Sequence, residues 1–218
     1  MKEAVILLSG GMDSAVLLQY LMQKLNRRDV HALSFLYGQK HCREIEMARV
    51  QAGIAGVKEH RIIEMPWLAE LVDGASALTE GAIPVPDLDE IEESSLNQPP
   101  TYVPNRNMVF LSLAAAYAEA AGISDVFYGA QAQDEYGYWD CTVDFVSRMN
   151  ELLALNRGKR VIIHAPFAEK TKSEVARLGR AMGVDFNRTW SCYRGGEEPC
   201  GKCPSCIERE RAIKEVSL

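Results

Sequence analysis

The sequence predicts an α/β fold, in which a parallel β-sheet is doubly wound with helices on both faces. Short apolar runs alternate with longer segments of helical periodicity along the chain, and this alternation is typical of parallel sheets. The chain has 218 residues, 47% of them hydrophobic and 25% charged, as in ordinary globular domains. No apolar run reaches the roughly 18 residues of a membrane-spanning helix, so no membrane partner is expected.

The first five elements follow from local pattern. Val5–Ser9 is an apolar run and reads as a buried strand, and Asp13–Leu25 carries leucine and valine at helical spacing. A second strand is expected at His31–Tyr37, where the letters are HALSFLY. His41–Ala55 reads as a helix with alternating charges, and Arg61–Met65 as a short third strand.

Regular structure is interrupted at residues 66–104. This stretch holds an acidic run at 87–93 and most of the prolines of the chain. A long stretch of this kind predicts a functional loop or a mobile lid instead of a domain linker.

Helices and strands alternate again beyond this loop. A helix is expected at Asn107–Ala121, which has a strong apolar stripe, and a strand at Asp125–Ala130. Helices at Thr142–Leu155 and Lys172–Met182 flank a fifth strand at Val161–Ala165. Open parallel sheets bind ligands at the carboxyl ends of their strands, so the turn after the first strand is a candidate site.

That turn reads LSGGMDSA, residues 8–15. Glycines let the backbone approach an anion, and the helix that follows offers free N–H groups and the positive end of its dipole. The Gly-Lys-Ser/Thr ending of a Walker A loop is absent. Asp13 is unexpected beside an anion, and it either caps the helix or holds Mg²⁺ that bridges phosphates. A glycine turn without a ligand is the remaining alternative.

Four cysteines gather near the C-terminus: Cys192, Cys200, Cys203 and Cys206. Their spacing fits a closed tetrahedral site of four thiolates. One structural Zn²⁺ is therefore expected to hold a segment of residues 190–218, with a last helix at Ser205–Val216, to an α/β domain of residues 1–189. Iron–sulfur ligation is the alternative.

Cys42 and Cys141 stand apart from this cluster. We expect them to be core thiols or thiols near a site. The alternative is a catalytic pair, as in enzymes that thiolate tRNA.

The formal net charge of −6 argues against a large nucleic-acid footprint, which needs clustered lysine and arginine. We expect a small-molecule substrate and no nucleic-acid partner. The apolar run at the N-terminus is too short for a signal peptide, so a cytoplasmic location is expected. A homodimer is also expected.

The turn resembles the PP-loop signature SGGxDS of the ATP pyrophosphatases, with a complete match over Ser9–Ser14. Further stretches narrow the resemblance: YGQKHCREIE at 37–46, PNRN at 104–107, GYWDC at 137–141, TKSE at 171–174 and the cysteine tail. Together they resemble the 7-cyano-7-deazaguanine synthase family from residue 4 to about residue 211. The resemblance implies a Rossmann-like fold of the adenine nucleotide alpha hydrolase type, with a C-terminal zinc-binding helical segment.

The resemblance implies an ATP-dependent ligase of queuosine precursor biosynthesis. Its reaction converts 7-carboxy-7-deazaguanine and ammonia to the 7-cyano compound through an adenylated acid and an adenylated amide, using ATP with Mg²⁺. The adenine is expected against the ends of the first two strands. The implied ATP-binding residues are Leu8, Ser9, Gly10, Gly11, Met12, Asp13, Ser14, Ala15 and Phe35.

The implied catalytic residues are Asp13, Arg106 and Lys172. Arg106 is expected to pair with the substrate carboxylate or the α-phosphate through its fork of donors, or else to anchor a loop by a salt bridge. Lys170 and Lys172 either meet phosphate or are solvated near the start of a helix.

The implied substrate-binding residues are Arg106, Asn107, Tyr138 and Asp140. Asp140 either accepts hydrogen bonds from the guanine-like ring or caps the helix that starts at Thr142. Tyr138 or Trp139 either stacks on the ring or packs in the core. His41 and Glu44 either assist proton removal from ammonium or are exposed helix charges.

Two departures from the family pattern concern the expected purine pocket. Trp139 stands where the pattern GYPDC has proline, and PNRN replaces PGRN. They leave one alternative within the ligases, namely transfer of the activated acid to a protein amine. A tRNA-modifying enzyme and a nucleotide sensor without turnover are further alternatives. The acidic charge argues against the former, and the complete turn with its cysteine tail argues against the latter.

Overall fold

The computed structural model describes residues 2–40, 42–79, 83–91, 99–132 and 137–216. They form a parallel five-stranded sheet in the order β3-β2-β1-β4-β5. The strands are β1 (Ala4–Leu7), β2 (Val30–Leu36), β3 (Glu59–Glu64), β4 (Asp125–Phe127) and β5 (Ile162–His164). The helices are α1 (Met12–Gln23), α2 (Arg43–Ala55), α3 (Trp67–Leu71), α4 (Arg106–Ala121), α5 (Val143–Leu153), α6 (Lys172–Ala181) and α7 (Pro204–Glu215).

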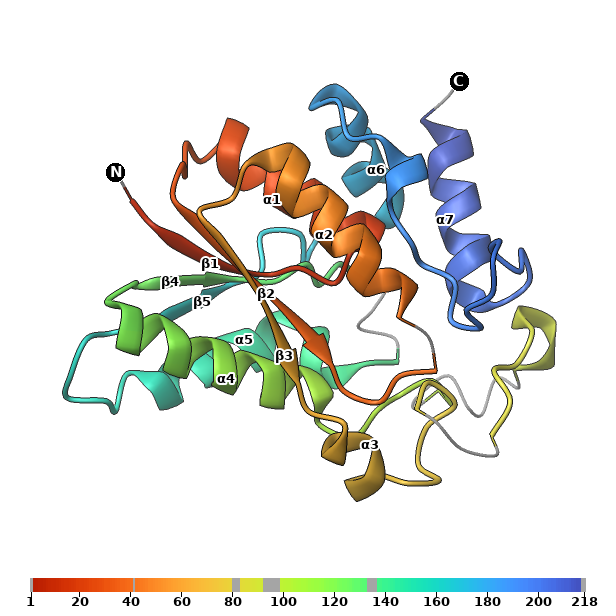
Figure 1. Ribbon diagram of the computed structural model, residues 1–218, viewed down its shortest axis with the longest axis horizontal. Helices are drawn as coiled ribbons and strands as arrows, with labels where there is room; N and C mark the ends of the chain where they lie inside the picture. The colour runs from red at the N-terminus through yellow and green to blue at the C-terminus, as the bar shows by residue number, and fades with distance from the viewer. Residues whose placement is uncertain (1, 41, 80–82, 92–98, 133–136, 217–218) are drawn as a thin grey trace.

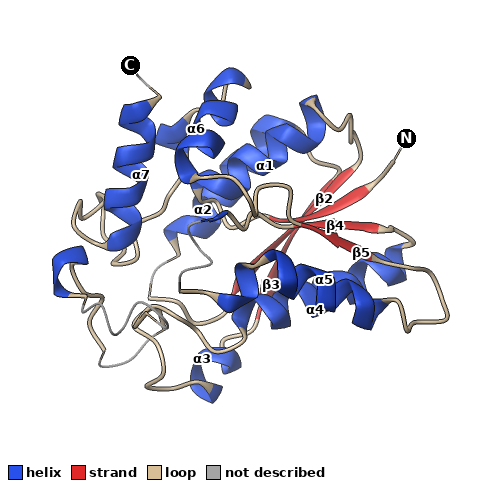
Figure 2. Ribbon diagram, turned by 180° about the vertical axis from the view of Figure 1, so that it is seen from behind, coloured by secondary structure: helices blue, strands red, loops and turns tan. Residues whose placement is uncertain are grey.

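The sheet lies between two helical layers (Figure 1). Helices α1, α2, α6 and α7 cover one face, and α4 and α5 cover the other, as the reverse view also shows (Figure 2). Each layer closes its own core, one around Leu17, Leu18 and Phe167 and the other around Leu111 and Val126. The predicted α/β fold with helices on both faces is therefore confirmed.

The order of the strands fixes the position of the glycine-rich turn. β1 pairs with β2 on one side and with β4 on the other. Strands β2 and β3 are therefore added on one side of β1, and β4 and β5 on the opposite side. Ligands of open α/β sheets bind in the crevice at such a switch point. The turn after β1 opens at this point.

The predicted strands and helices all overlap observed ones, whereas α3 is not predicted. Its five residues, WLAEL, are too few to display a helical period. It lies in the loop of residues 66–104, whose described parts bury Leu78, Val85 and Tyr102. Residues 80–82 and 92–98 of this loop lie outside the described residues, and its action as a lid stays a prediction.

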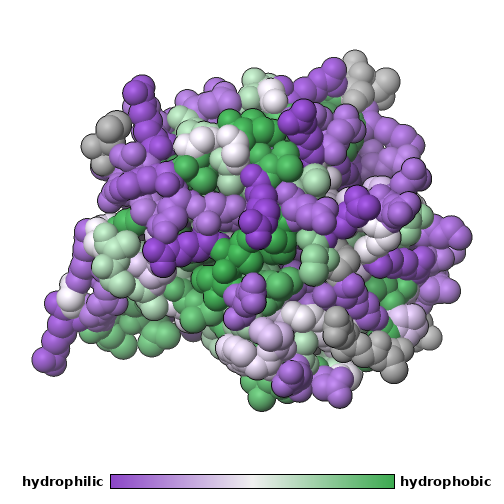
Figure 3. Space-filling view, in the orientation of Figure 1, coloured by the Kyte–Doolittle hydropathy of each residue, from purple (hydrophilic) through white to green (hydrophobic). Residues whose placement is uncertain are grey.

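Figure 3 shows one face of the molecule, with hydrophobic side chains gathered across its middle and hydrophilic ones around them. In the view of Figure 1 this middle region lies between the two helical layers. Within the described ranges, no helix combines the length and the apolar character needed to cross a membrane.

Candidate functional site

A cleft of about 240 Å³ opens at the carboxyl ends of β1, β2 and β4. The glycine-rich turn forms one end, and the start of α4 with the segment before α5 forms the other. A third wall comes from the chain around the cysteine cluster. Its polar lining includes Ser9, Asp13, Ser14, Ser34, Tyr37, Glu44, Arg106, Asn107, Tyr128, Tyr138, Lys172, Ser191, Tyr193 and Ser205.

The glycine-rich turn is organised by its own serines. Ser9 and Ser14 bring their hydroxyl oxygens within 3.1 Å, and the N–H of Gly11 donates to the Ser9 hydroxyl at 3.2 Å. The Ser14 hydroxyl donates to the Gly11 carbonyl at 3.0 Å. Helix α1 begins at Met12, within this stretch, without a side-chain cap. Its first N–H groups and the positive end of its dipole therefore face the cleft, as an anion site requires.

Gly10 makes a close packing contact with α2 that the sequence pattern does not predict. It does not line the cleft, and its φ is +84°. A Cβ at this position would lie 2.0 Å from the Glu44 carbonyl oxygen and 2.6 Å from the Ala48 nitrogen. The missing side chain therefore lets α2 pack against the turn, and the phosphate-binding role expected of Gly10 stays a prediction.

We expect Gly10→Ala to destabilise the fold by at least ~2 kcal/mol, because it combines a positive φ with a backbone clash. Urea unfolding measures the effect. Gly53→Ala is the matched control on α2, where a Cβ meets nothing within 4 Å, and it should stabilise the fold by roughly 0.5–1 kcal/mol. Equal stability of the two variants would contradict this account of Gly10.

Asp13 and Lys172 meet beside the turn. The Lys172 ammonium lies 3.7 Å from Asp13 Oδ2 and 3.4 Å from Glu208 Oε2 of α7. Asp13 Oδ1 is buried and has no hydrogen-bond partner among the described residues. Asp13 is the second residue of α1, and no side chain caps this helix, so the capping alternative is not observed. An unpartnered carboxylate oxygen at an anion site fits a hard cation such as Mg²⁺.

Arg106 begins α4 and faces the end of β2. Its Nη1 donates to the Tyr37 hydroxyl at 3.3 Å, and the guanidinium lies 5.8 Å from the centre of that ring. Within the described part of the chain, no ion pair holds Arg106. The loop-anchoring salt bridge is therefore not observed there, and Arg106 lines the cleft.

Glu44 also lines the cleft, so it is not the exposed helix charge of the alternative interpretation. Burial raises the pKa of its carboxyl to about 7, against the opposing effect of Arg106. His41, the other residue considered for proton removal, lies outside the described residues.

Asn107 links the start of α4 to the segment before α5. Its backbone N–H donates to Asp140 Oδ2 at 3.1 Å, and its amide donates to Asp140 Oδ1 at 3.3 Å and to Cys141 Sγ at 3.2 Å. Asp140 thus binds the N-terminus of α4, while Thr142 caps α5 with its own side chain. Asp140 is buried and absent from the cleft lining, and its contact with a purine stays a prediction.

The two aromatic residues before Asp140 differ in their positions. Tyr138 lines the cleft and shares a hydrogen bond of 2.6 Å with Thr101. Trp139 is 48% exposed and does not line the cleft. Its indole N–H donates to the Tyr102 hydroxyl at 2.8 Å. Tyr138 is therefore the residue available for stacking, and Trp139 braces the loop that ends at α4.

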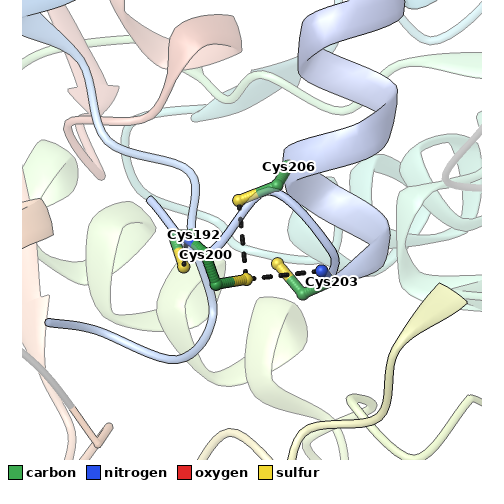
Figure 4. Close-up of side chains that lie close together, drawn as sticks. All are labelled: Cys192, Cys200, Cys203 and Cys206. Carbon is green, nitrogen blue, oxygen red and sulfur yellow. Dashed lines mark hydrogen bonds between the residues drawn. The ribbon is translucent and has the colours of Figure 1, made fainter. Parts of the chain in front are cut away.

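The four clustered cysteines lie close together at the start of α7 and in the chain before it (Figure 4). Their sulfur atoms all lie within 4.8 Å of one another, and a tetrahedral zinc site with bonds of about 2.3 Å places its sulfurs roughly 3.8 Å apart. Backbone N–H groups of Cys200 and Cys203 donate to neighbouring sulfurs, each at 3.4 Å. The arrangement fits a closed metal site.

The cysteine cluster is continuous with the cleft. Ser191 precedes Cys192 and Ser205 precedes Cys206, and both serines line the cleft. The N–H of Trp190 donates to the Gly10 carbonyl at 2.9 Å. A metal at the cluster would therefore fix one wall of the site.

The two remaining cysteines, Cys42 and Cys141, differ in their burial and in their place relative to the cleft. Cys141 is buried and lines the cleft, whereas Cys42 is exposed before α2. Both are free. This fits a thiol near the site and gives no support to a catalytic pair.

A model of the family described as "Queuosine biosynthesis protein QueC" matches residues 3–217. The chain belongs to the QueC family. A 7-cyano-7-deazaguanine synthase from Trichodesmium erythraeum is 43% identical, over 99% of this chain and 97% of the relative. One from Clostridium kluyveri is also 43% identical, over 99% of this chain and 95% of the relative.

Solved structures similar to this QueC family member are more distant in sequence. An NMN synthetase from Francisella tularensis has a TM-score of 0.52 at 15% identity, over 99% of this chain and 87% of that one. A tRNA thiolase from Methanococcus maripaludis has a TM-score of 0.51 at 16% identity, over 99% of this chain and 64% of that one. At such identity these likenesses show the fold alone.

Most of the predicted site residues of this QueC chain meet in the one cleft. Besides the turn, they include Phe35, Arg106, Asn107, Tyr138 and Lys172. Ala15 is buried in α1 and, like Gly10, does not line the cleft. The lining residues that sequence reasoning misses include Tyr37, Gly129, Trp190, Ser191, Tyr193 and Ser205. These residues could have been identified in the sequence by their positions, which are at the ends of strands or next to the clustered cysteines.

Proposed function

We propose that the chain converts 7-carboxy-7-deazaguanine and ammonia to 7-cyano-7-deazaguanine with ATP, through adenylated acid and amide intermediates. The relatives named 7-cyano-7-deazaguanine synthase support the overall reaction. The single observation that carries the mechanism is the buried, unpartnered Oδ1 of Asp13 at the anion-binding turn, with Lys172 at 3.7 Å from the other oxygen. A carboxylate and an ammonium at a helix N-terminus match a metal-bound pyrophosphate.

The cleft provides a place for each reactant. The turn and Lys172 hold the pyrophosphate portion of ATP, and Phe35 lies at the end of β2, where the adenine is expected. At the other end, Arg106 orients the substrate carboxylate, and Tyr138 lies against the deazapurine ring. Asp13 would hold Mg²⁺, which supplies charge neutralisation of the phosphates. The chain's own contribution is positioning and electrostatic stabilisation.

The reaction then takes two activations. The substrate carboxylate attacks the α-phosphorus, pyrophosphate leaves, and the acyl adenylate forms. Ammonia attacks the acyl carbon, AMP leaves, and the amide forms with loss of a proton. The amide oxygen then attacks the α-phosphorus of a second ATP, and pyrophosphate and one proton of the amide nitrogen leave. Loss of AMP and of the second nitrogen proton gives the nitrile.

The cysteine segment, residues 190–218, is proposed to bind one structural Zn²⁺ and to complete the ATP-binding domain of residues 1–189. The four sulfurs lie within 4.8 Å of one another, and this close approach suits a single tetrahedral ion, which supports this choice of metal. The homodimer and the cytoplasmic location stay predictions.

Incubation with Mg-ATP, 7-carboxy-7-deazaguanine and ammonium tests the proposed function, with products read by mass spectrometry. The nitrile, AMP and pyrophosphate are expected, with two ATP consumed per nitrile. A reaction that stalls at the adenylate or amide would point instead to another acceptor, such as a protein amine. The absence of ATP consumption that depends on the acid would refute both.

A further inference from the structure

Glu44 lines the cleft beside the phosphate turn. Its backbone packs against Gly10, since a Cβ on Gly10 would lie 2.0 Å from the Glu44 carbonyl oxygen. Glu44 also lines the same cleft as Arg106. Under the proposed function an acyl adenylate joins the turn to Arg106, and its reacting carbon lies between these two groups, both of which interact with Glu44.

Glu44 and Arg106 face the cleft without forming an ion pair. The positive charge of Arg106 lowers the pKa of Glu44 from a distance, but the two side chains do not form an ion pair. The Arg106 guanidinium can therefore bind the substrate carboxylate, and the Glu44 carboxylate can bind a small cation. Ammonium is the small cation that the proposed reaction requires.

The surroundings suit a carboxyl that exchanges protons near neutral pH. Burial raises the pKa of Glu44 to about 7 although Arg106 opposes this change, and a base works best with a pKa near the working pH. Arg106 from α4 and the Tyr37 phenol after β2 are the groups that face it most directly. The other titratable groups that line the cleft are Asp13, Lys172, Cys141, Tyr128, Tyr138 and Tyr193. On α2 itself, Arg43 lies over the Trp190 ring and Glu46 is exposed.

We propose that Glu44 binds ammonium and takes its proton, which generates the ammonia that attacks the adenylated acid. This inference rests on the proposed function. One N–H bond of ammonium breaks, its proton passes to the carboxylate, and the nitrogen keeps the electron pair that forms the new C–N bond as AMP leaves. Glu44 then returns its proton to solvent.

Glu44→Gln tests this proposal by comparing two nucleophiles. At pH 7 we expect kcat/KM for ammonium to fall by about 100-fold. Hydroxylamine is uncharged at this pH and needs no deprotonation before attack, so its conversion to the hydroxamate should be unchanged. Acid-dependent exchange of pyrophosphate into ATP, measured without ammonium, should also be unchanged, because it reports adenylation alone.

Glu46→Gln is the matched control, since Glu46 is exposed in the first turn of the same helix, and it should leave all three rates unchanged. An equal loss of all three rates in Glu44→Gln would overturn the proton-transfer role, as would an unchanged rate with ammonium. If the unaltered chain shows no acid-dependent exchange, the proposed function itself fails. That result is distinct from a failure of Glu44 alone.

Discussion

We expect Asp13→Asn to lower acid-dependent ATP cleavage by at least ~100-fold while the fold stays intact. Asparagine keeps the shape of the side chain and removes its negative charge. The carboxylate lies beside the N-terminus of α1 and the Lys172 ammonium, with one buried oxygen unpartnered among the described residues. Under the proposed function, its negative charge binds Mg²⁺ when Mg-ATP occupies the turn. Pyrophosphate release measures the loss, and a higher Mg²⁺ requirement should accompany it.

Asp144→Asn is the matched control for this prediction. Asp144 is also the second residue of its helix, but it pairs with Arg148 at 2.9 Å on the surface. Loss of such a pair costs about 0.3–0.5 kcal/mol and should leave activity unchanged. Asp13→Asn should change the free energy of unfolding, measured without nucleotide, by less than ~1 kcal/mol. Normal turnover in Asp13→Asn, or a loss explained by unfolding, would contradict the assigned role.

The sheet and the turn were predictable because their signals are local. A buried strand followed by SGGMDS and a helical stripe specifies a strand, a turn and a helix within a few residues. The alternation of strand and helix further along then requires a parallel sheet. Helix α3 could not be predicted in this way, because its five residues in a proline-rich loop are too few to show a helical period.

The candidate site was predictable where one motif contains the residues, and less so where the fold assembles them. Asp13 and Lys172 meet from the starts of α1 and α6, which a motif resemblance anticipates. The position of Glu44 in the cleft depends on Gly10, because the missing Cβ lets α2 approach the turn. Sequence spacing alone cannot distinguish such a residue from an exposed helix charge.

Asp140 illustrates the same limit for a polar side chain. A carboxylate before a helix suggests either a cap or a ligand contact. In the structure it accepts hydrogen bonds from Asn107, at the start of a helix that is distant in sequence. Burial raises the pKa of Asp140, against the opposing effects of Arg106 and Asn107. Only the tertiary packing of α4 on this segment decides the partner.

Loss of the cysteine-bound metal should damage both stability and ATP binding. We expect Cys203→Ala to abolish metal binding and to lower stability by roughly 3 kcal/mol, or about 6–12 °C in Tm for a chain of this size. Cys203 is fully buried in a small core with Trp190 and Val85. Elemental analysis should find one zinc per unaltered chain, and a colourless protein would exclude the iron–sulfur alternative.

The functional part of this prediction follows from the continuity of the cluster with the cleft. Ser191 and Ser205 line the site next to clustered cysteines, and the N–H of Trp190 donates to the carbonyl of Gly10 in the turn. The same segment brings Glu208 to 3.4 Å from the Lys172 ammonium. Releasing it should therefore raise the KM for ATP at temperatures where the α/β domain remains folded.

Cys42→Ala is the matched control, because Cys42 is an exposed free thiol outside the cluster. It should keep the zinc, the Tm and the KM for ATP of the unaltered chain. Removal of zinc by a chelator should reproduce the effects of Cys203→Ala, and added zinc should reverse them. If the metal-free chain kept its KM for ATP while its Tm fell, the metal would stabilise the fold without organising the cleft.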